Sequence, residues 1–252
     1  MAIRTEAASL VWLAAADGAS VAELVEIGSD WLTTRYLASG SPSPAAAAEF
    51  GRRLAVTHAA GADRWGAAPP GFDGSHLDLA GLPAPADNTT GEPRWRSFGE
   101  FYAEARIRPY LAAAFDSEDQ LLLHRACDLI ASGAFDSPQP GRCGAVARIH
   151  GDLWGGNVVW ARVGGEVVGT LIDPCAHGGH AETDLAELAL FGSAHLADTL
   201  RGYHEVSPLA DGWRERVELH QLHMLVIHAR LFGGGYVRQS TEVARRLLRR
   251  VS

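Results

Sequence analysis

The amino-acid sequence predicts an α+β protein in which a small strand-containing segment precedes a mostly helical body. Strand-like patterns are confined to the first 40 residues and to a short stretch between positions 150 and 175. Most of the remaining chain repeats its apolar residues at helical spacing. The 252 residues are 47% hydrophobic and 21% charged, which is enough material for one large domain or two small lobes.

The first part of the chain predicts one helix and two strands. Apolar residues recur at helical spacing over Arg4–Ala16, and Gly18 can end this helix. Val21–Ile27 and Trp31–Leu37 have the composition of short strands on either side of a turn at 28–30. We therefore expect a small antiparallel sheet beside one helix.

The body follows a linker of serines and prolines at Ser39–Pro44. Residues 61–91 are rich in glycine, proline and aspartate and predict a long loop, a common place for substrate contacts. Val158–Val163 and Val167–Ile172 alternate as a β-hairpin, and Ala145–Ile149 is a short apolar run. Helices are predicted at Ala45–Ala59, Trp95–Ala114, Ser117–Ser132, Ala181–Phe191, Trp213–Leu231 and Val243–Val251.

Charge and cysteine usage restrict the class of partner. The formal net charge is −8, which argues against a broad nucleic-acid-binding surface because phosphate neutralisation needs excess basic residues. All 22 basic residues are arginines. Three cysteines without a CxxC spacing indicate a reducing compartment. With no signal peptide and no apolar run of the roughly 18 residues that span a bilayer, we expect a cytoplasmic protein without a membrane partner.

The sequence HGDLWGGN at 150–157 carries the strongest chemical signal, together with Asp173 sixteen residues later. Phosphoryl transfer needs one carboxylate facing the attacking hydroxyl, and a second carboxylate and an amide oxygen holding Mg²⁺ between phosphates. Asp152 and Asn157 can point from one loop into one cleft, and a returning hairpin can bring Asp173 to the same metal. Asp152 alone would fit a polar turn equally well, but the ordered set predicts a phosphotransferase.

The same stretch resembles the HGDLWxGN signature of the fructosamine (ketosamine) kinase family, within the aminoglycoside phosphotransferase and protein-kinase-like superfamily. The shorter pattern HGDxxxxN is shared with aminoglycoside and choline kinases, whereas the longer one is typical of this family. Further stretches are similar to family segments: Pro85–Asn88 with Trp95 and Phe98, Ile172–Gly192, Pro208–Arg216, and His220–Tyr236 with its LFGGGY end. The resemblance covers nearly the whole chain from Glu6 on.

This resemblance implies a protein-kinase-like fold. Residues 1–39 would be the remnant of the N-terminal lobe, a small antiparallel sheet plus one helix and the hinge, lacking the family's glycine-rich loop and ATP lysine. Residues 40–252 would be a large, mostly helical C-terminal lobe with the catalytic and metal loops.

It also assigns roles to single residues. Asp152 would be the catalytic base and His150 would brace its loop, while Asn157 and Asp173 would bind Mg²⁺. ATP would contact Glu6 and the backbone of the hinge. In the family, the residue at the position of Glu6 pairs with the ATP lysine. The remaining positions are the hinge residues Thr34, Arg35, Tyr36 and Leu37, and the substrate-contacting residues Trp154, Asn88 and His177.

The implied activity is ATP-dependent phosphorylation of a sugar hydroxyl on a ketoamine adduct such as a fructosamine or ribulosamine, free or attached to a protein. In this family the phosphorylated product becomes unstable and releases the amine, which amounts to deglycation. Two alternatives remain: another small-molecule kinase, of the aminoglycoside or choline type, or a catalytically impaired pseudokinase.

The chain also departs from the family pattern. It contains no lysine and begins five residues before Glu6. Ala86, Ala181 and His177 stand where the family has glutamine, arginine and tyrosine. We therefore expect weak ATP binding and slow turnover by this chain, and an uncovered apolar surface on the helix around Ala7, Leu10 and Val11 that could associate with a second copy.

Overall fold

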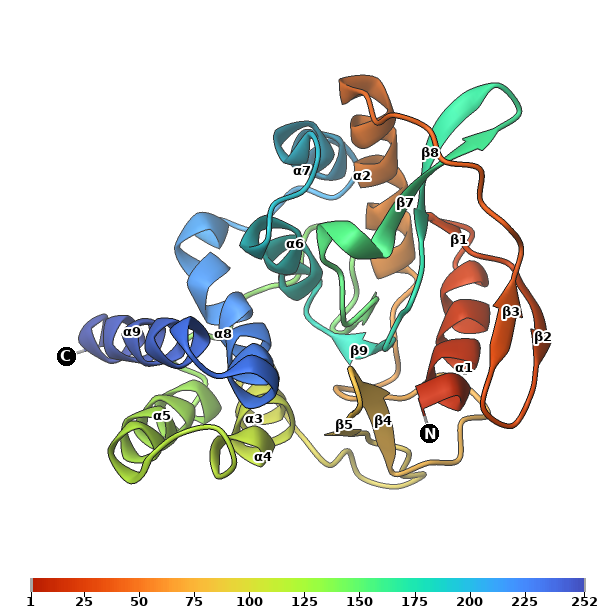
Figure 1. Cartoon of the computed structure of the whole chain (residues 1–252). Coiled ribbons are helices and arrows are strands. Elements are labelled where there is room, and N and C mark those ends of the chain that lie inside the picture. Colours follow the sequence, from red (N-terminus) through yellow and green to blue (C-terminus); the bar gives the residue numbers. More distant parts are fainter. Residues whose placement is uncertain (1, 252) are drawn as a thin grey trace. The chain divides into compact units, whose positions relative to one another are not determined.

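The computed structural model describes residues 2–251, which fall into two compact units (Figure 1). The first unit comprises the chain up to residue 88 together with residues 138–211. The second comprises residues 89–137 and the chain from residue 212 onward. All the candidate site residues lie in the first unit. The predicted boundary between two lobes at residue 39 stays a prediction.

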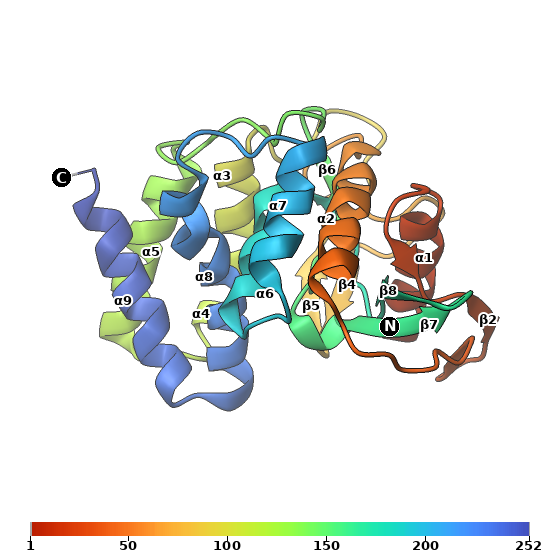
Figure 2. The same ribbon diagram turned by 90° about the horizontal axis from the view of Figure 1, so that it is seen from above.

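The first unit combines four helices with nine short strands, among the described residues. Its elements, labelled in Figure 1 except for β6, which Figure 2 labels, are α1 (Ala2–Ala14), β1 (Ser20–Val21), β2 (Leu24–Ile27), β3 (Leu32–Thr34), α2 (Pro44–Ala59), β4 (His76–Leu79), β5 (Leu82–Pro85), β6 (Ala147–Ile149), β7 (Val158–Val163), β8 (Glu166–Leu171), β9 (His177–Gly179), α6 (Ala181–Leu190) and α7 (Leu196–Val206).

The predicted hairpin around residue 164 is confirmed and forms a three-stranded sheet in the order β1-β8-β7. The predicted single strand Val21–Ile27 is wrong. Its start, β1, pairs in parallel with β8, whereas β2 pairs antiparallel with β3. The change of partner follows Ala22, whose N–H still donates to Leu171 O at 2.9 Å. Because the backbone groups before and after Ala22 hydrogen-bond to two different strands, β8 and β3, the segment is divided into two strands.

The long loop predicted for residues 61–91 contains a hairpin, so that prediction is wrong over β4 and β5. Leu77 and Leu79 are buried on one face of β4, with 0% and 2% exposure. The two-residue turn places Ala80 at φ 50° and Gly81 at φ 81°, the backbone that tight hairpins need. Because alanine is rare in that conformation, the sequence lacks the usual turn signal.

Two further features of the first unit were not predicted. β9 pairs antiparallel with β6, which places Ile149 opposite His177 beside the HGD stretch. Helix α7 lies along α2, as Figure 2 shows, and a Cβ at Gly202 would lie only 1.9 Å from Ala48 O. Its N-cap residue His195 adopts φ 57° and makes no capping bond with its side chain, so the sequence carries no helix-start signal there.

The second unit is helical throughout its described elements: α3 (Phe98–Phe101), a π-helical segment (Tyr102–Ile107), α4 (Arg108–Leu111), α5 (Ser117–Ala131), α8 (Trp213–Phe232) and α9 (Gly235–Arg249). The helix predicted from Trp95 begins at Phe98, because Ser97 Oγ caps it by accepting from Glu100 N at 3.1 Å. The last helix begins at Gly235 rather than Val243. No helix of residues 2–251 has the length and apolar character needed to cross a membrane.

Candidate active site

A cavity of about 240 Å³ in the first unit brings together the acidic residues of the predicted site. Asp152 and Asn157 reach it from the loop after β6, and Asp173 from the end of β8. Glu6 reaches it from α1, and Asp78 from β4. The sequence predicts the first four of these residues but not Asp78, because the glycine- and proline-rich segment around it predicts a loop and not the hairpin that carries it.

Asn157 holds the catalytic loop in a closed conformation. Its Nδ2 donates to Asp152 O at 2.8 Å and to Asp152 Oδ2 at 3.2 Å. The side chain is buried, with 5% exposure, at the end of a short 3-10 turn over Gly155–Asn157. Since the amide nitrogen is engaged with Asp152, the amide oxygen is the atom left for a cation.

The environment of Asp152 favours its protonated form more than water does. Burial raises the pKa of this carboxyl to about 6, the hydrogen bond from Asn157 opposes the shift, and the negative charges of Asp173 and Asp184 add to it. A carboxylate with a pKa near neutrality is better suited to accept a proton than one of ordinary acidity. The Asp152 carboxylate can therefore serve as a general base.

Glu6 and Asp173 form a close pair of carboxyl groups. Burial, the charge of Asp173 and a hydrogen bond shared with Asp173 raise the pKa of Glu6 to about 7. Asp173 itself has φ 51°, an uncommon backbone conformation for a residue other than glycine and one that is often found at functional sites. No basic side chain among the described residues is paired with Glu6, so the carboxylates face each other directly.

His150 connects the two loops. Its Nε2 lies 2.9 Å from Ile172 O, next to Asp173, and its Nδ1 accepts a hydrogen bond from Asp152 N at 3.3 Å. Burial lowers the pKa of the ring, which outweighs the opposing effect of Asp184. A neutral ring with Nε2 protonated and Nδ1 unprotonated makes both bonds, so the structure is consistent with the bracing role predicted for His150.

Asp184 on α6 anchors the backbone of the HGD stretch and was missed by sequence reasoning. Its Oδ2 accepts from His150 N at 2.7 Å, and its Oδ1 accepts from Gly151 N at 3.0 Å. Glu187, one helical turn later, accepts from Leu153 N at 2.8 Å through Oε2. The available signal was the spacing of Asp184 and Glu187, three residues apart and so on one face of a helix rich in alanine and leucine.

Asp184 is fully buried, and its own partners keep it charged. Burial alone would raise the pKa of this carboxyl, but the hydrogen bond and charge of His58, with the bond from His150 N, lower it. His58 Nε2 lies 3.0 Å from Asp184 Oδ2, and His58 Nδ1 lies 2.9 Å from Tyr203 OH. Helices α2, α6 and α7 thus share one buried polar network under the catalytic loop.

The glycine of the HGD stretch is required by its surroundings. Gly151 has φ 79°, a conformation that residues with a side chain rarely adopt. A Cβ there would lie 2.3 Å from Cys175 O and 2.7 Å from the His177 ring. The close approach allows the catalytic loop to lie directly against the segment that follows Asp173.

The predicted substrate residues do not line this cavity. Asn88 instead donates to Phe72 O at 3.2 Å and Gly74 O at 2.6 Å, and thereby holds the loop before β4. Trp154 is 41% exposed and packs edge-on against Phe191. His177 is buried, with Nδ1 2.8 Å from Cys175 O. Their assignment to substrate binding stays a prediction.

The predicted hinge also lies outside the lining of this cavity. Arg35 N donates to Glu23 O at 2.9 Å, and its guanidinium pairs with the Glu23 carboxylate at the surface. Tyr36 is 87% exposed and Leu37 is half-buried. The segment continues past Leu37 into a backbone contact with β7, where Arg162 N donates to Ala38 O at 2.7 Å. Its assignment to adenine binding stays a prediction.

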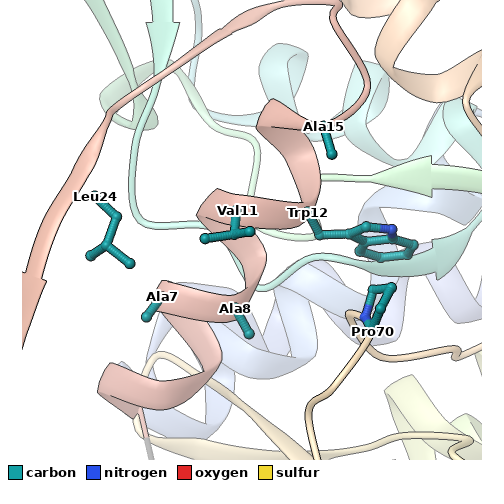
Figure 3. Close-up of a pocket in the computed structure, with 7 residues that line it drawn as sticks. All are labelled: Ala7, Ala8, Val11, Trp12, Ala15, Leu24 and Pro70. Carbon is teal, nitrogen blue, oxygen red and sulfur yellow. The ribbon is translucent and has the colours of Figure 1, made fainter.

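A second cavity, of about 410 Å³, lies against the outer face of α1 and is apolar (Figure 3). Val11, Trp12, Leu24 and Pro70 line it together with Ala7 and Ala8 of α1 and Ala15 just after α1, and no titratable side chain of the described residues is in its lining. Val11 is 59% exposed, as expected for an uncovered surface, but Ala7 and Leu10 are buried with 6% and 1% exposure, so the expectation is wrong for those two residues. The lining offers no group for catalysis.

The acidic cavity has the donor set of a Mg²⁺ site. Asp173 offers carboxylate oxygens and Asn157 an amide oxygen, and hard divalent cations prefer oxygen ligands. Burial and, next to it, the negative charge of Asp173 raise the pKa of Glu6, and a nearby cation would relieve the repulsion between the two carboxylates. The residues therefore fit the metal that the sequence predicts.

An HGD loop followed by a hairpin and a second carboxylate, in an α+β fold, defines a phosphotransferase of the kinase-like class. The sequence profile of the fructosamine kinase family matches residues 1–250. The chain belongs to this family, which confirms the predicted fold class, resemblance and enzyme class.

Individual relatives agree with this assignment. A protein of Synechocystis named a ketoamine kinase is 30% identical over 232 residues, which is 88% of this chain and 69% of that protein. The ketosamine-3-kinase of Mus musculus is 31% identical over 155 residues, 60% of this chain and 47% of the mouse protein. A crystal structure from Thermobifida fusca named as a fructosamine-3-kinase superposes with a TM-score of 0.81 at 40% identity, over 98% of this chain and 80% of that one.

Proposed function

We propose that the chain phosphorylates a sugar hydroxyl of a ketoamine adduct with ATP. The observation that carries the proposal is the convergence of Asp152, Asn157 and Asp173 on one cavity of about 240 Å³. Family membership supports the reaction class, since this is a family of kinases. The anchoring of the loop by buried Asp184 supports a preorganised site rather than a polar surface turn.

In the proposed reaction Asp152 accepts the proton of the attacking hydroxyl. The hydroxyl oxygen forms a bond to the terminal phosphorus of ATP, and the bond from that phosphorus to the bridging oxygen breaks, releasing ADP. Asp152 suits this role because its pKa of about 6 leaves it mostly unprotonated at neutral pH but still basic. Asn157, bonded to Asp152 Oδ2, fixes the direction in which the carboxylate points.

Asn157 and Asp173 are the proposed Mg²⁺ ligands. Bound Mg²⁺ would neutralise part of the phosphate charge. The acidic side chains of the cavity cannot do so, because they are themselves negatively charged. His150 connects the two loops through Ile172 O and Asp152 N, so it holds the base and the metal-binding carboxylate at a constant separation. For adenine we propose the backbone of Thr34–Leu37, where the Leu37 N–H has no backbone partner among the described residues.

Ketoamines are the proposed acceptors because relatives along most of this chain are named for them. Fructosamine and ribulosamine adducts, free or attached to a protein, are the two candidate classes. Phosphorylation of such an adduct would make it unstable and release the amine, so the proposed physiological result is deglycation in the cytoplasm. Association through the outer face of α1 remains a further prediction.

The proposal is tested by incubating the protein with Mg·ATP and either fructosyl-lysine or ribulosyl-lysine. The products are identified by mass spectrometry. We expect ADP and a sugar phosphate in equal amounts. ADP without a sugar phosphate, or phosphorylation only of unrelated alcohols, would contradict the function.

A further inference from the structure

Asp78 is a carboxylate of the acidic cavity that the proposed reaction leaves without a role. Asp152 is assigned to the hydroxyl, Asp173 and Asn157 to the metal, and Glu6 lies against Asp173. Asp78 enters the same cavity from β4, a separate element. A carboxylate in a cavity whose lining holds no basic side chain among the described residues is suited to a cationic group of a bound ligand.

The structure fixes the Asp78 backbone firmly. Its N–H donates to Thr5 Oγ1 at 3.0 Å, and Thr5 is buried on α1 with 1% exposure. Leu77 and Leu79 are buried on the opposite face of β4, and alternation along the strand directs Asp78 the other way. Asp78 is therefore held in the wall of the cavity by both α1 and the packing of its own hairpin.

One oxygen of Asp78 has a structural task and the other does not. Oδ1 accepts the N–H of Gly81 at 2.9 Å and so closes the turn between β4 and β5. Oδ2 makes no hydrogen bond or ion pair among the described residues. The turn needs only a neutral acceptor, which an asparagine would provide, so the negative charge is not explained by the hairpin.

A ketoamine carries the charge that matches this oxygen. Its nitrogen joins the sugar carbon next to the carbonyl and is a protonated secondary amine at neutral pH. It lies only a few bonds from the hydroxyls of the sugar, so a cavity that places one hydroxyl at Asp152 must also accommodate the ammonium nearby. No basic side chain is among the residues that line the cavity within the described part of the chain.

From these observations, and resting on the proposed function, we infer that Asp78 binds the substrate ammonium and selects charged ketoamines over neutral sugars. The N–H of the ammonium donates to Asp78 Oδ2, which forms a charge-assisted hydrogen bond. A neutral ketose with the same hydroxyls fills the sugar part of the cavity but leaves Asp78 unpaired. Asp78 is thus a specificity-determining residue and takes no part in proton or phosphoryl transfer.

The test compares two ligands that differ at the ketoamine nitrogen. Fructosyl-lysine carries the ammonium, and its derivative acetylated at the ketoamine nitrogen is neutral there. Both are titrated without nucleotide by calorimetry into the parent protein and into Asp78→Asn, which preserves the acceptor for Gly81 N. Asp73→Asn, an exposed aspartate before the hairpin that lines no part of the cavity, is the matched control.

We expect Asp78→Asn to weaken fructosyl-lysine binding about tenfold and to change the acetylated ligand by less than about twofold. Asp73→Asn should leave both unchanged, and melting temperatures should show that all three proteins are folded. Equal weakening of both ligands by Asp78→Asn would overturn the inference, as would a loss of Mg²⁺ affinity that marked Asp78 as a metal ligand.

Failure of the inference is distinguishable from failure of the proposed function. If the parent binds fructosyl-lysine and Asp78→Asn binds it equally well, only the role of Asp78 is wrong. If the parent protein binds neither ligand but binds an aminoglycoside or choline, the proposed function fails and the inference fails with it.

Discussion

His58 and Asp184 lie 126 residues apart in the sequence, yet His58 Nε2 is 3.0 Å from Asp184 Oδ2 in the buried part of the first unit. The same Asp184 oxygen accepts the N–H of His150, and its other oxygen accepts that of Gly151. The pair therefore connects α2 to the backbone from which Asp152 projects. Tyr203 OH, 2.9 Å from His58 Nδ1, extends the network to α7.

The first prediction concerns this network. His58→Phe should lower the free energy of unfolding by about 1.5–3 kcal/mol, because it removes a buried hydrogen bond to a charged group. It should also lower kcat more than it raises KM, since the base is displaced rather than the substrate site. Tyr203→Phe, which removes only the remote hydroxyl, should have a smaller effect on both. Parent-like kcat in a folded His58→Phe protein would show that Asp184 needs no support.

The second prediction is that Asp152→Asn abolishes most activity but leaves the fold intact. Loss of a positioned general base costs about 10²- to 10⁴-fold in rate. The melting temperature should not fall, because a neutral amide avoids the burial penalty that raises the pKa of this carboxyl to about 6. Turnover and melting are measured on the same samples, with the exposed Asp30→Asn as a control. An active Asp152→Asn protein would disprove the assignment of the base.

The third prediction separates the two proposed metal ligands. Asp173→Ala should remove the Mg²⁺ dependence of nucleotide binding, because it takes away a charged ligand. Asn157→Ala should weaken Mg·ATP binding less but should disturb Asp152, which loses two hydrogen bonds. Calorimetric titration of ATP with and without Mg²⁺ decides the matter. If Asp173→Ala binds Mg·ATP as the parent does, the metal is held elsewhere.

The fourth prediction uses the pH dependence of stability. Glu6 has a folded-state pKa of about 7, raised from 4.5 by burial and by Asp173. A raised pKa in an acid means that the folded state binds the proton more tightly than the unfolded state. Its stabilising contribution is therefore fully present below about pH 4.5 and is lost as the pH rises through 7.

Without Mg²⁺, Glu6→Gln should consequently melt at a higher temperature than the parent above pH 7, and the difference should shrink toward pH 4.5. Thermal melts across this range measure it, and the effect should be modest because Glu6 is partly exposed and solvent screens its charge. A constant difference at every pH would mean that Glu6 and Asp173 do not share a proton.

The sequence predicted the chemistry more completely than the fold around it. Asp152, Asn157 and Asp173 were found because catalytic chemistry needs particular residue types at a particular spacing, and the β7–β8 hairpin between them has regular alternation. Glu6 was placed through its position in the family's first helix. Each of these signals is local or belongs to one motif.

The missed features depend on contacts between distant segments. Asp184 and His58 are ordinary helix residues in the sequence, and only the packing of α2 on α6 and α7 makes them supports of the catalytic loop. Asp78 lies in a segment whose turn uses Ala80 at a positive φ, which is not a usual turn signal. The strand pattern around Asp78 is only four residues long, and the surrounding glycines and prolines favour a loop. Sequence periodicity cannot reveal such partners.

The most direct test of the central claim is a competition assay in which fructosyl-lysine, kanamycin and choline are offered together with Mg·ATP. Product is followed over a long incubation, so that slow turnover is also detected. We expect phosphorylated fructosyl-lysine to form first and Asp152→Asn to form none. Preferential phosphorylation of kanamycin or choline, or product formation that persists in Asp152→Asn, would contradict it.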